Sequence, residues 1–95
     1  MKLRWTRSAR RDREAIYAYV QADNAEAALT LDERILQRVN QLVEFPLIGR
    51  EGRLAGMREL SIPGSSYLLA YTVTGDTIWI AGVIHTARAW PDQTE

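Results

Sequence analysis

Five residues of this sequence have side chains suited to binding or cleaving a phosphodiester. Arg50, Arg53 and Arg58 lie in or just after a glycine-rich segment, and His85 and Arg88 follow or end the last apolar segment. If a sheet brings these side chains to one edge, the arginines form a cationic pocket that stabilises the charge developing during attack by a 2′-hydroxyl group. An imidazole has an unperturbed pKa of about 6.5, so His85 is a candidate general acid or base in that pocket.

Each of these residues also has a purely structural interpretation. Arginines in a glycine-rich loop commonly remain solvated or pair with neighbouring acids, here Glu51 and Glu59. His85 is equally a candidate for a hydrogen-bonded residue that closes the last strand. The spacing alone leaves both interpretations open.

Composition and charge restrict the chemistry further. The 95 residues include no cysteine and one histidine, which excludes disulfides, thiolate or multi-histidine metal sites and cysteine nucleophiles. With no phosphate loop, dinucleotide fingerprint or hydrolase motif, we expect neither a cofactor nor a metal. A formal net charge of zero gives little long-range attraction to nucleic acid and favours a protein partner. Without an apolar run of ~20 residues or an apolar signal segment, the sequence predicts a cytoplasmic protein without a membrane span.

Cations are concentrated at the start of the chain. Before Glu14, the single acid Asp12 stands against Lys2, Arg4, Arg7, Arg10, Arg11 and Arg13. Acidic residues predominate over residues 14–45. The N-terminal arginines are interpreted either as a solvated helix face or as a docking surface for an acidic partner.

The first half of the sequence predicts a strand and two helices. A short strand is expected at residues 2–6, followed by Ser8 as the N-cap of a helix over residues 9–22. Asn24 is a second N-cap, and apolar residues at three- and four-residue spacing predict a helix over residues 25–45 that ends before a proline. The two helices are expected to pack as a hairpin.

The second half predicts a loop and three strands. Residues 47–56 contain three glycines and indicate a loop, and strands are expected at residues 57–62, 67–73 and 77–85 as an antiparallel meander. The last strand is apolar on both faces, which is typical of a central strand. The predicted fold is α+β, a single domain over residues 1–95 with the order β-α-α-β-β-β and a helix hairpin packed on an antiparallel sheet.

Three tryptophans complete the set of candidate residues. Trp79 lies within the last predicted strand and is expected in the core, whereas Trp5 and Trp90 are interpreted as core residues or interface anchors.

Several short motifs resemble the RelE/ParE superfamily of bacterial toxins from type II toxin–antitoxin pairs. They are P-x-x-G-R at residues 46–50, G-x-R-E-L at 56–60, Y-x-x-x-Y at 67–71 and H-x-x-R-x-W-P at 85–91. The resemblance spans nearly the whole chain and implies the same small β-α-α-β-β-β fold. It also implies a growth-inhibiting toxin that is held inactive by a cognate antitoxin wrapped around its surface.

The superfamily includes RelE-like ribosome-dependent endoribonucleases, which cut messenger RNA, and ParE-like inhibitors of DNA gyrase. This sequence departs from the basic pattern of the nucleases. Leu68 stands where they carry an arginine, and Glu59 and Ser61 stand where two cations are expected. Arg88 matches a catalytic arginine of that pattern, and His85 lies near, but out of register with, the histidine that other nuclease members use.

The resemblance therefore favours a ParE-like toxin that binds and inhibits DNA gyrase without catalysis and is neutralised by a cognate antitoxin. Its expected target-binding residues are Arg50, Arg53, Arg58, Arg88 and Trp90. The alternative is a RelE-like mRNA interferase that acts on the ribosome and messenger RNA. In that alternative Arg58, His85 and Arg88 are the catalytic residues.

Overall fold

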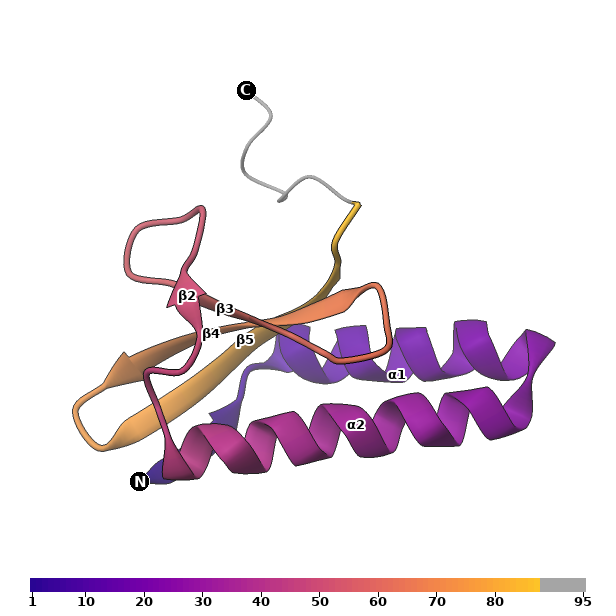
Figure 1. The fold of residues 1–95 in the computed structure, drawn as a ribbon, viewed down its shortest axis with the longest axis horizontal. Helices are drawn as coiled ribbons and strands as arrows, with labels where there is room; N and C mark the ends of the chain where they lie inside the picture. Colours follow the sequence, from indigo (N-terminus) through magenta and orange to yellow (C-terminus); the bar gives the residue numbers. More distant parts are fainter. Residues whose placement is uncertain (88–95) are drawn as a thin grey trace.

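The computed structural model describes residues 1–87, which form two helices and a five-stranded sheet (Figure 1). The elements in chain order are β1 (Lys2–Trp5), α1 (Arg7–Asp23), α2 (Ala25–Glu44), β2 (Arg50–Glu51), β3 (Arg58–Ser61), β4 (Tyr67–Thr74) and β5 (Thr77–His85). The predicted α+β fold with a helix hairpin on a sheet is confirmed. Neither helix of this part of the chain has the length and apolar character that crossing a membrane requires.

Short polar side chains define where each helix begins. The Thr6 hydroxyl accepts a hydrogen bond from the Ala9 backbone N–H at 3.0 Å, and Thr6 has an extended backbone, so it is the N-cap of α1. The prediction of Ser8 as this cap was wrong, because helical geometry already includes Ser8. Asn24 caps α2 as predicted, with its side-chain oxygen accepting from the Ala27 N–H at 3.0 Å.

The sheet has the strand order β1-β5-β4-β3-β2. β3, β4 and β5 form the predicted antiparallel meander, and β1 adds to β5 in parallel, so β5 is an interior strand as expected. β2 was not predicted. Residues 50–51 pair antiparallel with β3 inside the segment interpreted as a loop, because two residues are too few for a strand signal in a glycine-rich sequence.

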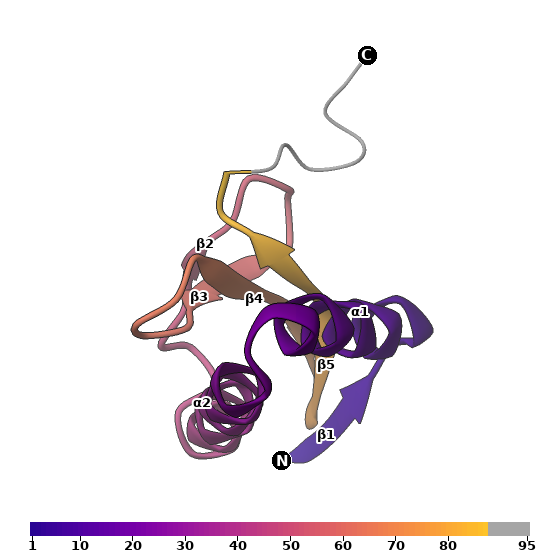
Figure 2. The ribbon, with the colours of Figure 1, turned by 90° about the vertical axis from the view of Figure 1, so that its right-hand side faces the viewer.

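The main core lies between the sheet and the two helices. Figure 2 shows both helices on one side of the sheet. Ile35, Val39 and Leu42 of α2 pack with the sheet residues Leu60, Leu69, Tyr71, Ile78 and Ile80, all of them buried. Trp5 is half-buried against this core.

The opposite face of the sheet is covered by much less of the chain. Leu54 and Met57, from the segment between β2 and β3, pack on Leu68, Ala70 and Ile84 there. Trp79 points to this same face and is 38% exposed, so the prediction that it belongs to the core was wrong. Its register partner on β4 is Thr72, and the covering segment does not extend over that pair.

An irregularity in β5 links the sheet to α1. The register between β4 and β5 shifts at Ala70/Tyr71, which leaves Ala81 as an extra residue on β5. The Val83 N–H beyond this bulge donates to the Asp12 carboxylate of α1 at 3.0 Å. The helix therefore takes over the edge of β5 where β1 has ended.

Candidate functional site

The predicted arginines of the glycine-rich segment surround a buried carboxylate. Glu59 on β3 is only 3% exposed. The Arg50 guanidinium donates to Glu59 Oε1 at 3.2 Å, and the Arg53 backbone N–H donates to Oε2 at 3.2 Å, with Arg53 Nε 3.6 Å from the same oxygen. Because a buried carboxylate needs a counter-charge and hydrogen-bond donors, this network holds Arg50 and Arg53 to the sheet.

Arg58 lies on the other face of the sheet and has a different acceptor. Its register partner is Tyr71, a core residue, whereas that of the neighbouring Glu59 is Ala70. Arg58 Nη1 donates to the Gly49 carbonyl at 2.7 Å. The three predicted arginines are therefore divided between the two faces of the sheet.

Tyr71, a residue of the core, holds the start of the glycine-rich segment by two hydrogen bonds. Its hydroxyl donates to the Pro46 carbonyl at 2.8 Å and accepts from the Gly49 N–H at 2.9 Å. A Cβ atom at Gly49 would lie 2.6 Å from the Tyr71 hydroxyl oxygen, so only glycine fits there. Burial raises the pKa of the Tyr71 hydroxyl above its ordinary value, which keeps it protonated and able to donate.

His85 lies far from these arginines along the sheet. It is the register partner of Tyr67, whereas Arg58 is that of Tyr71, four residues further along β4. With about 3.3 Å per residue and about 4.8 Å between strands, the Cα atoms of Arg58 and His85 are roughly 16 Å apart. The His85 ring packs edge-on against Tyr67, with centroids 5.2 Å apart, and its Nδ1 accepts from the Ala87 N–H at 3.1 Å.

The described members of the predicted pocket do not form one cationic site. Arg50 and Arg53 are bound to Glu59, Arg58 to a backbone carbonyl, and His85 to the chain end of β5. Arg88 and Trp90, the remaining predicted residues, lie outside the described part of the chain. The arrangement ties the segment between β2 and β3 to the sheet and holds the three arginines to acceptors within the chain.

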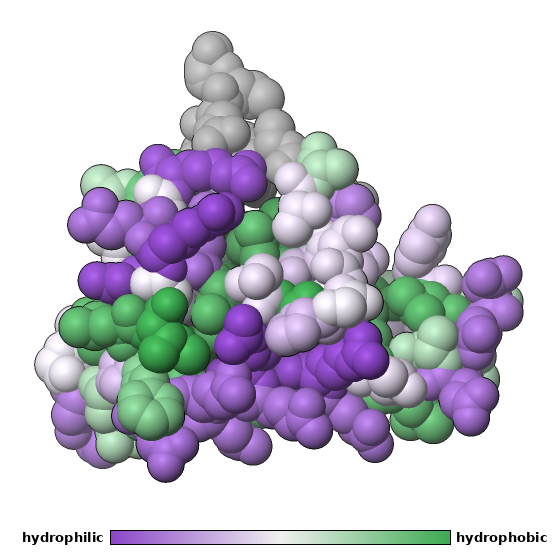
Figure 3. Space-filling view, viewed as in Figure 1, coloured by the Kyte–Doolittle hydropathy of each residue, from purple (hydrophilic) through white to green (hydrophobic). Residues whose placement is uncertain are grey.

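Apolar side chains are exposed next to this segment. Phe45, Leu47 and Ile48, which we term the 45–48 patch, are 56%, 63% and 43% exposed. Figure 3 shows apolar surface gathered over the C-terminal end of α2 and the chain leading to β2, beside the charged surface of the following segment. Clustered exposed apolar side chains beside polar ones are typical of protein-binding surfaces.

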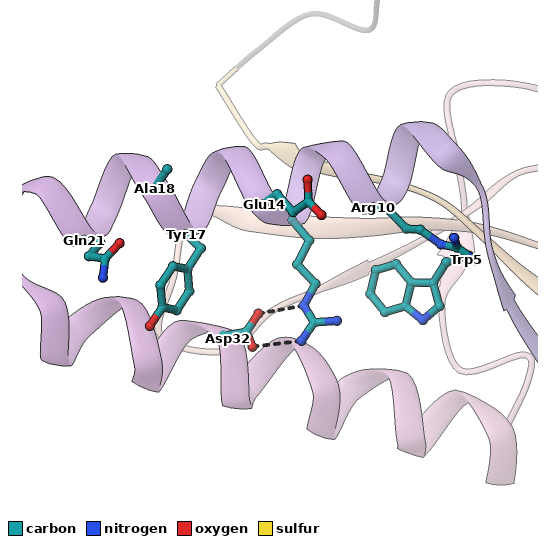
Figure 4. A pocket seen from close by; sticks show the side chains of 8 residues that line it. Trp5, Arg10, Glu14, Tyr17, Ala18, Gln21 and Asp32 are labelled. Carbon is teal, nitrogen blue, oxygen red and sulfur yellow. Dashed lines mark hydrogen bonds and ion pairs between the residues drawn. The ribbon is translucent and has the colours of Figure 1, made fainter.

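A groove of about 530 Å³ runs along α1 near β1 and α2 (Figure 4). Within it, Arg13 of α1 donates to both carboxylate oxygens of Asp32 of α2, at 2.7 and 2.9 Å. This pairing lowers the pKa of Asp32 and raises that of Arg13. The Arg13 guanidinium also lies 5.4 Å from the ring centre of Trp5, within cation–π range. These contacts join the two helices to β1.

Comparison with known proteins identifies the family. The family described as "ParE toxin of type II toxin-antitoxin system, parDE" matches residues 3–90. The chain belongs to the ParE toxin family. A relative in Sinorhizobium fredii, named "Putative toxin Y4kP", is 36% identical over 90 residues, which are 95% of this chain and 93% of the relative. A chain in the structure titled "Chromosomal ParDE TA system from P. aeruginosa" is 30% identical with a TM-score of 0.81, covering 90% of this chain and 95% of that one.

The resemblance seen in the sequence motifs is thereby confirmed at the level of the family and the fold. This ParE toxin is a component of a type II toxin–antitoxin system, and that membership implies a cognate antitoxin as its partner.

Several features of this ParE toxin had no recognisable sequence signal. Arg13 and Asp32 are 19 residues apart on different helices, so their pairing depends on how the hairpin packs. The exposure of Phe45 and Leu47 was also unforeseen, because apolar residues before a proline and a glycine resemble the end of a buried helix face. Alternation along a strand places Glu59 and Leu60 on opposite faces of the sheet, but it does not predict that Glu59 is buried.

Proposed function

We propose that this ParE toxin inhibits DNA gyrase by binding to it in the cytoplasm, without catalysis of its own, and that the cognate antitoxin prevents this binding. The observation that carries the proposal is the buried Glu59, which holds the side chains of both Arg50 and Arg53 within the chain. Stabilising a phosphodiester transition state requires donors that are free to meet developing charge. Here Arg50 and Arg53 share an internal carboxylate, and Arg58 donates to the Gly49 carbonyl.

The distribution of the other candidate residues supports the same choice. A general acid or base must reach the reacting atoms within hydrogen-bond distance or through one water. His85 and Arg58 lie roughly 16 Å apart between Cα atoms, and the Arg58 guanidinium is bound to the Gly49 carbonyl. An RNA-cleaving site built from these two residues is therefore not favoured.

The 45–48 patch supports a protein target. Its side chains are large, apolar and adjacent, and the segment that follows them is fixed by Tyr71 and Glu59. A rigid apolar surface binds with a smaller loss of conformational freedom than a mobile one. We place the gyrase contact on this patch together with the neighbouring Arg50, whose side chain is 73% exposed.

A supercoiling assay with purified proteins tests this proposal. The toxin is expected to inhibit ATP-dependent supercoiling of relaxed plasmid by gyrase. Leu47→Asp should raise the half-inhibitory concentration more than about tenfold, because it introduces a charge at the contact. Leu29→Asp is the matched control, since Leu29 is 55% exposed near the other end of α2.

Induction of the toxin in cells distinguishes gyrase inhibition from cleavage of messenger RNA. Transcript 5′ ends are mapped within minutes of induction without antitoxin. Growth arrest with intact messages and relaxed plasmid is the expected result. New 5′ ends phased to codons within translated messages would overturn the proposal in favour of an mRNA interferase.

A further inference from the structure

The arginines at the start of α1 lie where a helix least tolerates positive charge. Arg7, Arg10 and Arg11 occupy the first five positions of α1, and no acidic residue lies in its first turn. The N-terminal end of a helix carries a partial positive charge, so cations there are destabilising. Arg7 is three residues from Arg10 and four from Arg11, so these like charges also repel one another on neighbouring positions of the helix surface.

The fold provides little compensation for these charges. Within residues 1–87, the ion pairs of the N-terminal cations involve Lys2 and Arg13, and neither Arg4, Arg7, Arg10 nor Arg11 has a carboxylate within 4.0 Å. The nearby acid Asp12 is directed to the Val83 N–H. Arg7, Arg10 and Arg11 are all exposed. Their positive charge therefore remains available to a partner.

Arg4 and Trp79 extend this surface onto the sheet. They are register partners on β1 and β5, so their side chains stand side by side on the sheet face away from the helices. Consecutive Cα atoms are 3.8 Å apart, so Arg4 is at most about 11 Å from Arg7. Arg7 and Arg11 are separated by about 6 Å along the helix axis. An extended segment of about five or six residues spans the path from Arg4 through Arg7 to Arg11. Arg10 lines the groove beside Trp5 and Glu14.

We propose that Arg4, Arg7, Arg10 and Arg11, together with the exposed Trp79, bind an acidic segment of the cognate antitoxin. This proposal rests on the proposed function and adds a second surface to it. Figure 2 shows β1 and the start of α1 on the opposite side of the molecule from β2 and β3. The antitoxin anchor is therefore separate from the surface assigned to gyrase.

An acidic protein segment suits this surface better than a nucleic acid. Carboxylates bind guanidinium groups in bidentate geometry and offset the positive end of the helix. Trp79 provides an apolar contact for a neighbouring side chain of the segment. The chain as a whole has a net charge of zero and a pI near 6.6, so it lacks the general attraction that a phosphate backbone requires.

Binding of the purified antitoxin to Arg7→Gln, Arg11→Gln and the double variant tests the assignment. We expect the dissociation constant at low salt to rise about tenfold for each arginine removed, because each loses a charge-assisted hydrogen bond. The difference from the wild type should shrink as salt is added. Arg34→Gln on α2 is the control with the same charge change, and it should bind as the wild type does.

Thermal unfolding of the free variants separates lost contact from lost structure. Because the two arginines oppose the helix dipole, the double variant should melt at the same temperature as the wild type or higher. Antitoxin affinity within twofold of the wild type in the double variant would overturn the proposal. The proposal would also be overturned if the double variant kept its antitoxin affinity but lost binding to a labelled DNA duplex. That result would assign the surface to nucleic acid.

Failure of this proposal is distinguishable from failure of the gyrase proposal. Antitoxin binding is measured directly and needs no gyrase. If the wild-type toxin leaves supercoiling unaffected but the double variant binds antitoxin weakly, the surface assignment stands alone. If the double variant binds antitoxin normally but no longer inhibits gyrase, the arginine surface belongs to the target, and the antitoxin assignment is wrong.

Discussion

The two edges of the sheet both carry arginines, but the arginines have opposite roles. At the β2 edge, Arg50 and Arg53 are bound to the buried Glu59, whose desolvation is offset by these contacts. At the β1 edge, Arg7 and Arg11 extend from the start of α1 without a carboxylate partner among residues 1–87. The same residue type stabilises the fold in one place and costs it stability in the other.

This difference indicates that an arginine cluster in a small toxin can have either a structural or a binding role. A cluster built around an internal acid needs no ligand to be stable. A cluster that opposes a helix dipole is a local conflict between sequence and structure, and such conflicts tend to occur at functional sites. Internal acceptors are therefore a better guide to an arginine's role than the number of arginines nearby.

The largest expected effect comes from removing the acid at the β2 edge. Glu59→Ala should lower the free energy of unfolding by about 2 to 3 kcal/mol, because Arg50 and Arg53 lose a buried charged acceptor and a cavity forms. Urea denaturation measures this change. Glu51→Ala is the control, since Glu51 is an exposed acid on β2. A loss below about 0.5 kcal/mol would mean that the β2 edge resembles the β1 edge after all.

Tyr71→Phe tests whether the segment beside the 45–48 patch is held from the core. The change removes the acceptor of the buried Gly49 N–H and the donor to Pro46, and should cost about 2 kcal/mol in urea denaturation. Because the pKa of Tyr71 is raised in the fold, this contribution is present below about pH 10 and is lost as the pH rises through the folded-state pKa. Tyr67→Phe, on the same strand, is the control and should change stability less.

The next effect concerns Arg13, the one arginine of α1 with a carboxylate partner within the described residues. Asp32→Asn should lower the free energy of unfolding by about 1 kcal/mol at pH 7, a value reduced by partial exposure of the pair.

Because the pKa of Asp32 is below 3.8 in the fold, its contribution is present above that pH and disappears as the pH falls through the folded-state value. The difference between Asp32→Asn and the wild type should therefore shrink below about pH 4. Glu33→Gln, an exposed neighbour, is the control. A difference independent of pH would contradict the ion pair.

The smallest effect has the opposite sign. Arg7→Gln should raise the free energy of unfolding by a few tenths of a kcal/mol at low salt, because one cation is removed from the helix start. Added salt should stabilise the wild type more than this variant. Chemical denaturation at two salt concentrations measures both. A loss of stability at low salt would show that Arg7 has a structural role.

Local patterns predicted β1, both helices and the meander, but not β2, because helix spacing and turn residues act over a few positions. Asn24 was recognised as a cap by its type and place. Trp79 was misplaced because an apolar strand does not reveal that one of its faces is only partly covered. The pairing of Arg50 and Arg53 with Glu59 could not be predicted, because Glu59 is buried only when the segment that contains Leu54 and Met57 folds back over the sheet.

The parallel pairing of β1 with β5 joins the two ends of the described chain, and the Thr6 hydroxyl bonds to Ala81 across 75 positions. Pairing of positions so distant in sequence is slow, because the long stretch of chain between them must first be closed into a loop. During synthesis, β1 has no partner until residues 77–80 have left the ribosome. The start of α1 therefore has its arginines in solution while its edge of the sheet is still incomplete. In each new toxin molecule, residues 2–5 are thus synthesised before the part of β5 with which they pair.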